Sequence, residues 1–346
     1  MTTPALRTTA RRTAEPETPW QKVGLVVGHA TDHEGATGCT VIRAAAGGMR
    51  ASAALIGRAS GTRELAVCRP EHLVDRIDAV LLSGGSAYGL DAAAGVMQWM
   101  EEKGRGFVVG AGVVPIVPAA VLFDLAPLGS FRARPTPAMA YQACDTATAM
   151  PLEGSVGAGT GAMVGRGLGV EHAMKGGVGC GSASSGAFTA VALAVVNSYG
   201  DVRDADGRII AGARSDHDEF ADTAAIVRAS SEGPPQRFAQ ATIAPPDGMM
   251  RNTTLAVVAV NASVSRVALQ QMAQAATAAF YRRITPCGTT FDGDVVFALC
   301  PPVGAVASAV VLEALAVAAL EEAIERAVRT AVGRDGVPGL ADPVAG

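Results

Sequence analysis

The chain has no closely spaced pair of cysteines. Its six cysteines are scattered singly through 346 residues and form no Cys-x-x-Cys motif: Cys39, Cys68, Cys144, Cys180, Cys287 and Cys300. Zinc-type spacing is therefore absent, and a chain of this length needs no disulfide bridges to stabilise its core. We expect reduced cysteines, a cytoplasmic location, and no bound metal ion or other cofactor.

Long apolar runs are also absent. A membrane-spanning helix requires ~18 uninterrupted apolar residues, and the nearest approach, residues 108–128, is interrupted by Pro115, Pro118 and Asp124. Residues 1–20 contain arginines and threonines but lack the apolar segment of a secretory signal. We predict a soluble protein with no membrane partner. We interpret 1–20 as a disordered extension, with a transit-like leader as the alternative.

Charged and aromatic residues are sparse. They make up 17% and 4% of the chain, and the formal net charge is −4. No Lys/Arg-rich run follows the first dozen residues, so nothing favours binding of nucleic acid. Apolar residues make up 49% of the chain and are mostly Ala and Val; the chain also has 41 glycines. This composition suits close-packed layers of strands and helices joined by tight turns. We predict one domain over 21–335 and a flexible tail over 336–346.

Apolar runs bounded by glycine, proline or polar residues predict the strands. They cover residues 22–29, 37–43, 53–56, 77–82, 188–197, 255–260 and 295–299, with two more between 106 and 125 around a Pro-containing turn. Amphipathic or Ala-rich segments predict helices over 91–103, 138–150, 263–283 and 305–332. Residues 204–247 are polar and rich in breakers, and we interpret them as a linker or external loop.

A glycine-rich turn, Ser83-Gly84-Gly85-Ser86-Ala87-Tyr88-Gly89, joins a predicted strand to a predicted helix. Such a turn presents backbone N–H groups at a helix N-terminus, where they can bind an anion or oxyanion. The turn has neither the G-x-G-x-x-G pattern nor the G-K-[ST] ending of nucleotide loops. Gly85, Ser86 and Tyr88 are therefore candidate substrate-binding residues, although Tyr88 could equally cover the helix end.

Two acidic clusters invite a metal interpretation. His29, Asp32, His33 and Glu34 fall in a predicted loop rather than on one helical face, and no third His follows nearby. Asp292-Gly293-Asp294 lacks the further ligands of a calcium loop. Paired carboxylates at a strand entrance suit orienting or proton-transfer roles better than metal binding.

Thr253 lies between a breaker-rich segment, 244–248, and the apolar run 255–260. A chain can be cut at such a position and the new amino terminus held rigidly, although a threonine can also simply begin a strand. Asn197 ends the predicted strand 188–197 and either donates to an oxyanion or caps a turn. Lys175 stands alone in a Gly-rich apolar segment, as a reactive desolvated lysine or as a surface lysine.

Taken in order, these segments resemble the L-aminopeptidase/D-esterase (DmpA-like) family, peptidase family S58. The motifs that carry the resemblance lie between residues 23 and 301: Val27-Gly28-His29-Ala30-Thr31-Asp32, Thr37-Gly38-Cys39-Thr40-Val41, the turn 82–90, Lys175-Gly176-Gly177-Val178-Gly179, Asn252-Thr253-Thr254 and Asp292-Gly293-Asp294. The resemblance implies an α/β (α+β) fold, a four-layer αββα sandwich like that of N-terminal-nucleophile hydrolases. It also implies a precursor that cleaves itself between Asn252 and Thr253 into an α chain (1–252) and a β chain (253–346), assembled as a homo-oligomer, a tetramer or larger.

The same resemblance implies a role for each candidate residue. Thr253 would be the nucleophile and Asn197 the oxyanion donor, Lys175 would assist activation and processing, Asp292 and Asp294 would orient Thr253, and Tyr88 would line the substrate cleft. The Asn-Thr junction and the Asp-Gly-Asp motif are similar to the nylon-oligomer hydrolase branch, whereas the aminopeptidase branch cuts between Gly and Ser. Cleavage would free the Thr253 α-amino group, whose ordinary pKa of about 7.7–8.0 suits a general base.

We therefore expect a self-processing amide hydrolase that acts on small peptides or ω-amino-acid oligoamides. The first alternative is an aminopeptidase or β-aminopeptidase with esterase activity. The second is acyl transfer like that of ornithine acetyltransferases, which have a related fold; they usually place a small apolar residue before the threonine, so Asn252 argues against it. The third is a non-catalytic scaffold.

Overall fold

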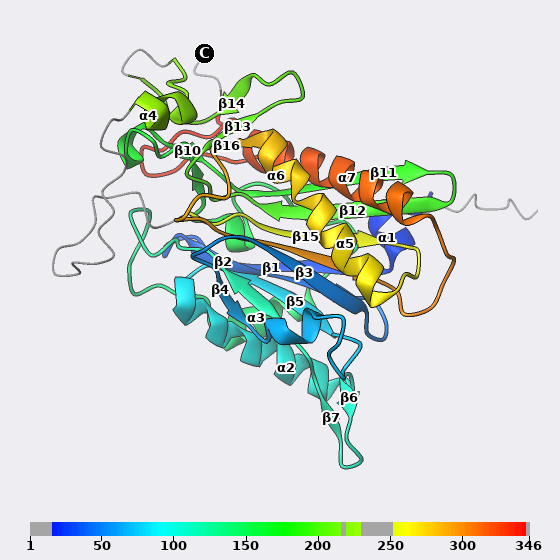
Figure 1. Cartoon of the computed structure of the whole chain (residues 1–346). Coiled ribbons are helices and arrows are strands. Elements are labelled where there is room, and N and C mark those ends of the chain that lie inside the picture. Colours follow the sequence, from blue (N-terminus) through cyan, green and yellow to red (C-terminus); the bar gives the residue numbers. More distant parts are fainter. Residues whose placement is uncertain (1–15, 216–218, 230–251, 344–346) are drawn as a thin grey trace, which may run out of the picture.

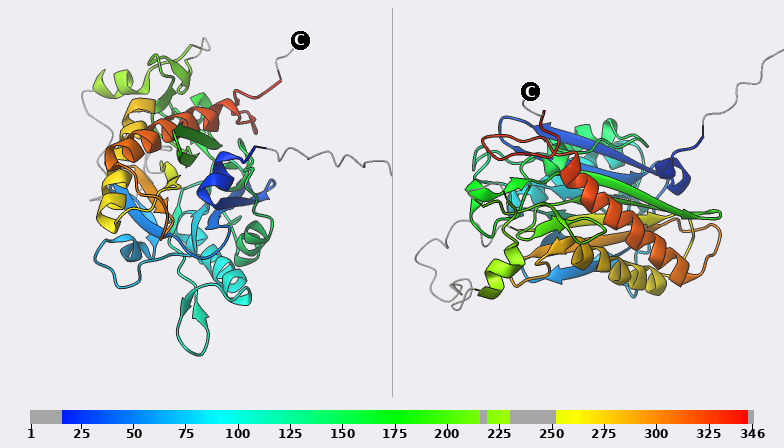
Figure 2. Two further views of the ribbon diagram at one scale, coloured as in Figure 1. Left: turned by 90° about the vertical axis from the view of Figure 1, so that its right-hand side faces the viewer. Right: turned by 90° about the horizontal axis from the view of Figure 1, so that it is seen from above.

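The computed structural model describes residues 16–215, 219–229 and 252–343. Two five-stranded sheets lie face to face, and helices cover the outer face of each sheet (Figures 1 and 2). The predicted αββα sandwich is therefore confirmed. The breaker-rich segment 244–248 and Arg251 lie outside the described residues, as do 1–15 and 344–346.

The two sheets are built mainly from antiparallel pairs. The first sheet has the order β1 (Leu25–Asp32), β2 (Thr37–Ala44), β5 (Ala79–Ser83), β8 (Ala119–Val121) and β4 (Gly61–Arg63). The second has the order β11 (Val178–Ser185), β12 (Phe188–Val195), β15 (Leu255–Val260), β17 (Gly293–Cys300) and β3 (Arg50–Gly57). In the second sheet, β15 and β17 pair in parallel, with Leu255 opposite Val295. Their entrances therefore lie side by side.

The long helices form the outer layers. The second sheet is covered by α5 (Arg266–Ala276), α6 (Ala278–Arg283) and α7 (Ala309–Arg329), and the first by α2 (Ala93–Glu102) and α3 (Pro137–Asp145). Shorter elements surround the layers: α1 (Pro19–Val23), α4 (Thr223–Ala229), η1 (Leu65–Cys68), η2 (Ser86–Ala92), η3 (Gly157–Gly159), η4 (Val170–His172), β6 (Phe107–Val108), β7 (Val113–Val114), β9 (Met163–Val164), β10 (Met174–Lys175), β13 (Asp201–Arg203), β14 (Ile209–Ala211) and β16 (Ile284–Thr285). None of the helices in the described part of the chain has the length and hydropathy needed to span a bilayer.

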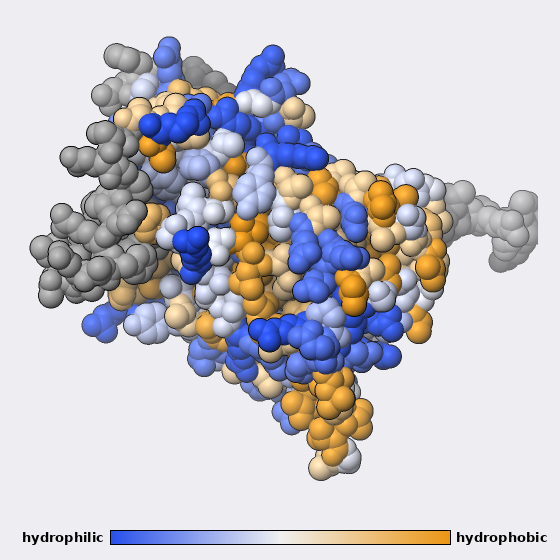
Figure 3. Space-filling model, viewed as in Figure 1, coloured by the Kyte–Doolittle hydropathy of each residue, from blue (hydrophilic) through white to orange (hydrophobic). Residues whose placement is uncertain are grey.

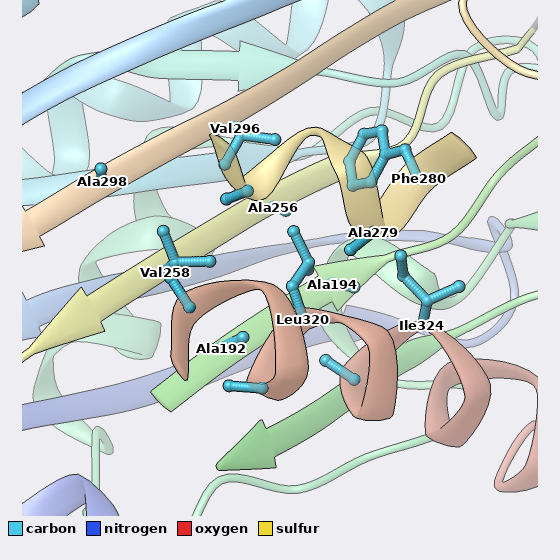
Figure 4. Close-up of a cluster of buried hydrophobic side chains, with 14 of the residues drawn as sticks. Ala192, Ala194, Ala256, Val258, Ala279, Phe280, Val296, Ala298, Leu320 and Ile324 are labelled. Atoms are coloured by element: carbon cyan, nitrogen blue, oxygen red, sulfur yellow. The ribbon is translucent and has the colours of Figure 1, made fainter. Parts of the chain in front are cut away.

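Side-chain size separates the two faces of the central strands. In β12, Val191, Leu193 and Val195 pack between the sheets, whereas the alternate residues are alanines that face the helices. Figure 4 shows this helix-facing side, where Ala192 and Ala194 lie beneath the larger side chains of α7. Small residues on the strands leave room for large residues on the helices, which explains the Ala-rich composition.

Glycines bring α7 still closer to β11. A Cβ added to Gly179 would lie 2.1 Å from the Ala323 carbonyl oxygen, and one added to Gly181 would lie 2.1 Å from that of Ala319. The helix and the strand therefore pack backbone against backbone. This contact accounts for part of the Gly-rich segment that precedes β12.

Several predicted boundaries are wrong. The strand predicted from residue 22 begins at Leu25, because Thr18 caps the short helix α1, which buries Trp20. Residues 16–20 thus belong to the domain rather than to an extension. The predicted helix 263–283 is divided at Thr277, whose hydroxyl donates to the Gln274 carbonyl and bends the chain.

Two further segments differ from expectation. Between 106 and 125 only β8 joins a large sheet, while β6 and β7 form a projecting hairpin with exposed apolar side chains (Figures 1 and 3). The predicted loop 204–247 contains β14 and α4, because the buried Asp201 carboxylate accepts the Thr223 N–H at 2.6 Å and the Ala213 N–H at 2.9 Å.

The predicted flexible tail is also wrong for residues 336–343. Val337 is buried, and the Pro338 carbonyl accepts the backbone N–H of Lys175 at 2.8 Å. The Asp342 carboxylate accepts the N–H groups of Gly333 and Gly339 at 2.6 and 2.8 Å. These contacts hold the segment against the domain.

The packing of α7 on β11 predicts a stability effect. Gly179→Ala should lower the free energy of unfolding by about 1–3 kcal/mol, because its Cβ would overlap the helix backbone. Urea unfolding measures the change. Gly112→Ala is the control, since a Cβ there meets no atom within 4 Å, and we expect it to alter stability by less than about 0.5 kcal/mol. Equal stability of the two variants would contradict the close contact.

Candidate active site

Thr253 lies where β15 and β17 enter the second sheet together. Asn252 forms a parallel bridge with Asp292, and the Gly293 N–H donates to the Asn252 carbonyl at 3.1 Å. The Thr253 N–H donates to the Asn197 carbonyl at 2.8 Å, and its hydroxyl donates to the Asn252 carbonyl at 2.6 Å. The Thr253 side chain is thus buried and lies directly against the peptide bond that is predicted to break.

Gly293 makes room for this hydroxyl. A Cβ at residue 293 would lie 2.8 Å from the Thr253 Oγ1 and 2.7 Å from the Ala59 carbonyl oxygen. The glycine between the two acidic residues is therefore a steric requirement of the site.

The carboxylates of Asp292 and Asp294 hold the backbone around Thr253. Asp294 accepts the Thr254 N–H at 2.6 Å, and Asp292 accepts the Thr289 N–H at 2.7 Å. Burial raises the pKa of both carboxyls, and the charge of Asp292 raises the pKa of Asp294 further, to well above its ordinary range. The pair therefore favours retaining a proton next to Thr253.

Asn197 follows β12 and contacts Thr253 through its backbone. Its Oδ1 accepts the Met163 N–H at 3.1 Å and a bond from the Arg166 guanidinium, while its Nδ2 donates to the Phe123 carbonyl at 3.4 Å. The two hydrogen bonds that Oδ1 accepts fix the orientation of the amide. Arg166, buried in the site, was missed by the sequence reasoning. The same sequence feature that singled out Lys175 could have identified Arg166, because each is a single cation in a Gly-rich apolar segment.

Lys175 is buried, so the surface-lysine interpretation is wrong. Its ammonium donates to the carbonyls of Ala162 at 2.5 Å and Thr160 at 3.1 Å. Burial, followed by the charge of Arg334, lowers the pKa of Lys175 to about 7; Asp124 opposes this shift and Arg166 adds a smaller contribution to it. These bonds hold the backbone of Thr160 and Ala162 in place. The N–H of the next residue, Met163, donates to the Asn197 side chain.

The glycine-rich turn differs from expectation. The N–H groups of Gly84, Gly85 and Ser86 are already bonded to the Gly38 carbonyl at 2.9 Å, the Asp124 carboxylate at 2.6 Å and the Leu122 carbonyl at 2.9 Å, respectively. They do not form an open anion site, and a buried aspartate takes the place of the anion. Tyr88 is half exposed beside this turn.

Asp124 joins the turn to the rest of the site. Its carboxylate also accepts the Thr37 hydroxyl at 2.7 Å, and its neighbour Phe123 accepts the Asn197 amide. Burial raises the pKa of Asp124 to about 6, against the opposing hydrogen bonds and the charge of Lys175. Sequence reasoning treated Asp124 only as an interruption of an apolar run.

The described residues contain no group of three His, Cys, Asp or Glu side chains arranged to hold a metal ion. His29 and Asp32 lie in β1 rather than in the predicted loop, because β1 extends to Asp32. The His29 Nδ1 contacts the Thr40 hydroxyl at 3.0 Å, and burial lowers the pKa of the imidazole to about 4. The Thr253 hydroxyl and the Asp292/Asp294 pair lie at one peptide bond, and Asn197 is joined to it through its backbone carbonyl. A hydroxyl and an amide are groups that nucleophilic acyl transfer uses.

Comparison with known proteins agrees with this chemistry. The model of peptidase family S58 matches residues 23–339. An uncharacterized aminopeptidase of Mycobacterium leprae is 44% identical over 253 residues, which are 70% of this chain and 65% of that protein. A 6-aminohexanoate-oligomer endohydrolase of Kocuria sp. (strain KY2) is 29% identical over 303 residues, which are 85% of this chain and 76% of that protein.

A solved structure extends the comparison to the fold. The L-aminopeptidase D-Ala-esterase/amidase of Ochrobactrum anthropi, described as a variant of the N-terminal-nucleophile hydrolase fold, superposes with a TM-score of 0.66 at 18% identity, over 92% of this chain and 89% of that one. The predicted resemblance in fold is therefore confirmed.

The raised pKa of Asp124 predicts a pH-dependent stability. Its folded pKa of about 6 exceeds the ordinary 3.8, so this group stabilises the fold below pH ~4 and loses that contribution as pH rises through 6. The loss is at most about 3 kcal/mol. Asp124→Asn should therefore gain stability relative to the native chain between pH 4 and 7, as measured by urea unfolding. The exposed Asp206→Asn is the control. An Asp124→Asn difference that does not change with pH would contradict the assignment.

Proposed function

Because the chain belongs to peptidase family S58, a family of amide-bond hydrolases, we propose that it is a self-processing N-terminal-threonine hydrolase of small peptides or ω-amino-acid oligoamides. One observation carries the proposal. The Thr253 hydroxyl contacts the carbonyl oxygen of Asn252 at 2.6 Å, and the Thr253 nitrogen is held by the Asn197 carbonyl at 2.8 Å. The hydroxyl is next to the bond to be cut. The nitrogen that would become the amino terminus is already held by its hydrogen bond to the Asn197 carbonyl.

Processing uses the hydroxyl on its own peptide bond. Oγ1 of Thr253 attacks the carbonyl carbon of Asn252, the C–N bond breaks, and the nitrogen takes up a proton, which leaves an ester between Asn252 and Thr253. Water then hydrolyses the ester to an Asn252 carboxylate and a free Thr253. During attack the Asn252 oxygen becomes negative, and the Gly293 N–H at 3.1 Å is aimed at that oxygen.

Turnover repeats these steps on a substrate amide. The freed α-amino group of Thr253 accepts the hydroxyl proton, and the hydroxyl forms an acyl ester with the substrate while the amine product leaves. Water releases the acyl group. Asn197 supplies the oxyanion donor for this reaction, since its Nδ2 bond to Phe123 is long and a nearer acceptor can replace it.

The buried charges serve this chemistry in different ways. Lys175, with its pKa lowered to about 7, can give up or receive a proton near neutral pH. Arg166 holds the Asn197 amide in place, and Asp294 holds the residue that follows the nucleophile.

The relatives support two substrate classes. The proteins of higher identity are named aminopeptidases, which favours removal of N-terminal residues. The Asn252-Thr253 junction and the Asp292-Gly293-Asp294 motif favour the oligoamide class of the Kocuria relative. We propose amide substrates of either class, with oligoamides first. A homo-oligomer of αβ units and a cytoplasmic location stay predictions.

The first test is cleavage of the chain. Purified protein should give two fragments with the masses of residues 1–252 and 253–346, measured by mass spectrometry. Thr253→Ala should stay uncut and inactive yet folded, because the attacking oxygen is gone. Thr254→Val is the matched control, since the Thr254 hydroxyl has no hydrogen-bond partner within residues 16–215, 219–229 and 252–343. Cleavage of Thr253→Ala would refute Thr253 as the nucleophile, and an uncut Thr254→Val would show that the loss of cleavage is not specific to Thr253.

The second test separates processing from turnover. Asn197→Asp keeps an oxygen for Met163 and Arg166 but loses the Nδ2 donor, so kcat should fall about 10²–10³-fold. Self-cleavage should continue, because the Gly293 N–H serves the Asn252 carbonyl. The two rates are measured separately, by substrate assay and by gel. Unchanged kcat, or an equal loss in both reactions, would contradict the proposal that the Asn197 amide serves turnover and the Gly293 N–H serves processing.

A further inference from the structure

Arg134 lies beside the glycine-rich turn and faces an aromatic ring. Its guanidinium carbon is 3.5 Å from the centroid of Tyr88 and 5.8 Å from that of Phe131. The next residue, Pro135, packs on the turn so closely that a Cβ on Gly85 would lie 2.9 Å from its ring. Stacking on Tyr88 holds the planar guanidinium in one orientation.

This guanidinium has no polar partner among the residues that the structure describes. Its Nε is buried yet donates to no acceptor in the described part of the chain, where Arg134 forms no ion pair either. Other partly buried arginines of the chain are paired, such as Arg283 with Glu321 and Arg326 with Glu153. A buried donor without an acceptor is unfavourable unless a ligand supplies one. Arg134 is therefore arranged to receive an anion.

The position is open to solvent, and the turn beside it is joined to Thr253 by contacts within the protein. Tyr88 and Phe131 are 54% and 55% exposed, so the two rings border a surface that a ligand can reach. A continuous set of contacts leads inwards. The Gly85 N–H bonds to Asp124, the Phe123 carbonyl accepts the Asn197 amide, and the Asn197 carbonyl holds Thr253.

We propose that Arg134, supported by Tyr88, binds the terminal carboxylate of a linear amide substrate. The inference rests on the proposed hydrolysis at Thr253 and narrows its substrate class to short chains that end in a free carboxylate. A guanidinium fork matches a carboxylate with two parallel N–H···O bonds, which an uncharged carboxamide cannot reproduce. The site therefore distinguishes a free chain end from a blocked one or from the interior of a long polymer.

A pair of substrates tests the proposal. The linear dimer of 6-aminohexanoate carries a terminal carboxylate, and its terminal carboxamide does not. Arg134→Gln should lower kcat/KM for the dimer about 10–100-fold, mainly through KM, because a charge-assisted bond is lost. The value for the carboxamide should stay within about twofold of the native one. Arg132→Gln is the matched control, since it removes an equal charge from an exposed residue of the same segment and should change neither value.

Three results would overturn the proposal: an equal loss on both substrates, no loss on the dimer, or the same loss in Arg132→Gln. Normal self-cleavage of Arg134→Gln establishes that the variant is folded. If the native enzyme hydrolyses neither compound, the proposed substrate class fails by itself, and calorimetry still tests Arg134. Hexanoate should then bind the native protein but not Arg134→Gln, with hexanamide binding neither. Absence of hexanoate binding to the native protein would refute the subsite.

Discussion

The parallel pairing of β15 with β17 is the contact on which the site depends. It sets Asn252 beside Asp292, and two backbone bonds join the strand entrances, from the Gly293 N–H to the Asn252 carbonyl and from the Val295 N–H to the Thr254 carbonyl. The strands are buried on both faces, and a slip of one residue would turn every side chain to the wrong layer. The register that packs the core therefore also fixes the Thr253 hydroxyl against its peptide bond.

Close packing keeps this entrance rigid. Alanines and glycines let α7 lie against the second sheet at backbone distance, and valines and leucines fill the space between the sheets. The C-terminal segment adds a further contact, because Pro338 bonds to the backbone of Lys175. A hydroxyl held in such surroundings, as the proposed reaction at Thr253 requires, loses little entropy on reaching a reactive geometry.

Charges buried together determine the chemistry of the site. Lys175, Arg166, Asp124 and the Asp292/Asp294 pair are all buried, and burial shifts the pKa of Lys175 downwards and those of the carboxyls upwards. The shifts bring ordinarily extreme groups towards neutral pH, where proton transfer is useful. Arg134 differs from these groups, because it faces solvent-exposed aromatic rings rather than other protein charges.

Much of this protein was determined by local sequence alone. Apolar runs located β3, β12, β15 and β17 of the second sheet, and breakers located the turns, because hydrophobic period and backbone restriction act within a few residues. The Gly-rich strand β11 was not predicted. The motifs around Thr253, Lys175 and Asp292 indicated the family and its fold. Only the tertiary structure decided how these motifs meet: that Asp124 occupies the N–H groups of the Gly85 turn, that Arg166 orients Asn197, and that the C-terminal segment packs on Lys175. Those contacts join residues far apart in the chain, and burial and electrostatics depend on three-dimensional neighbours that no sequence pattern specifies.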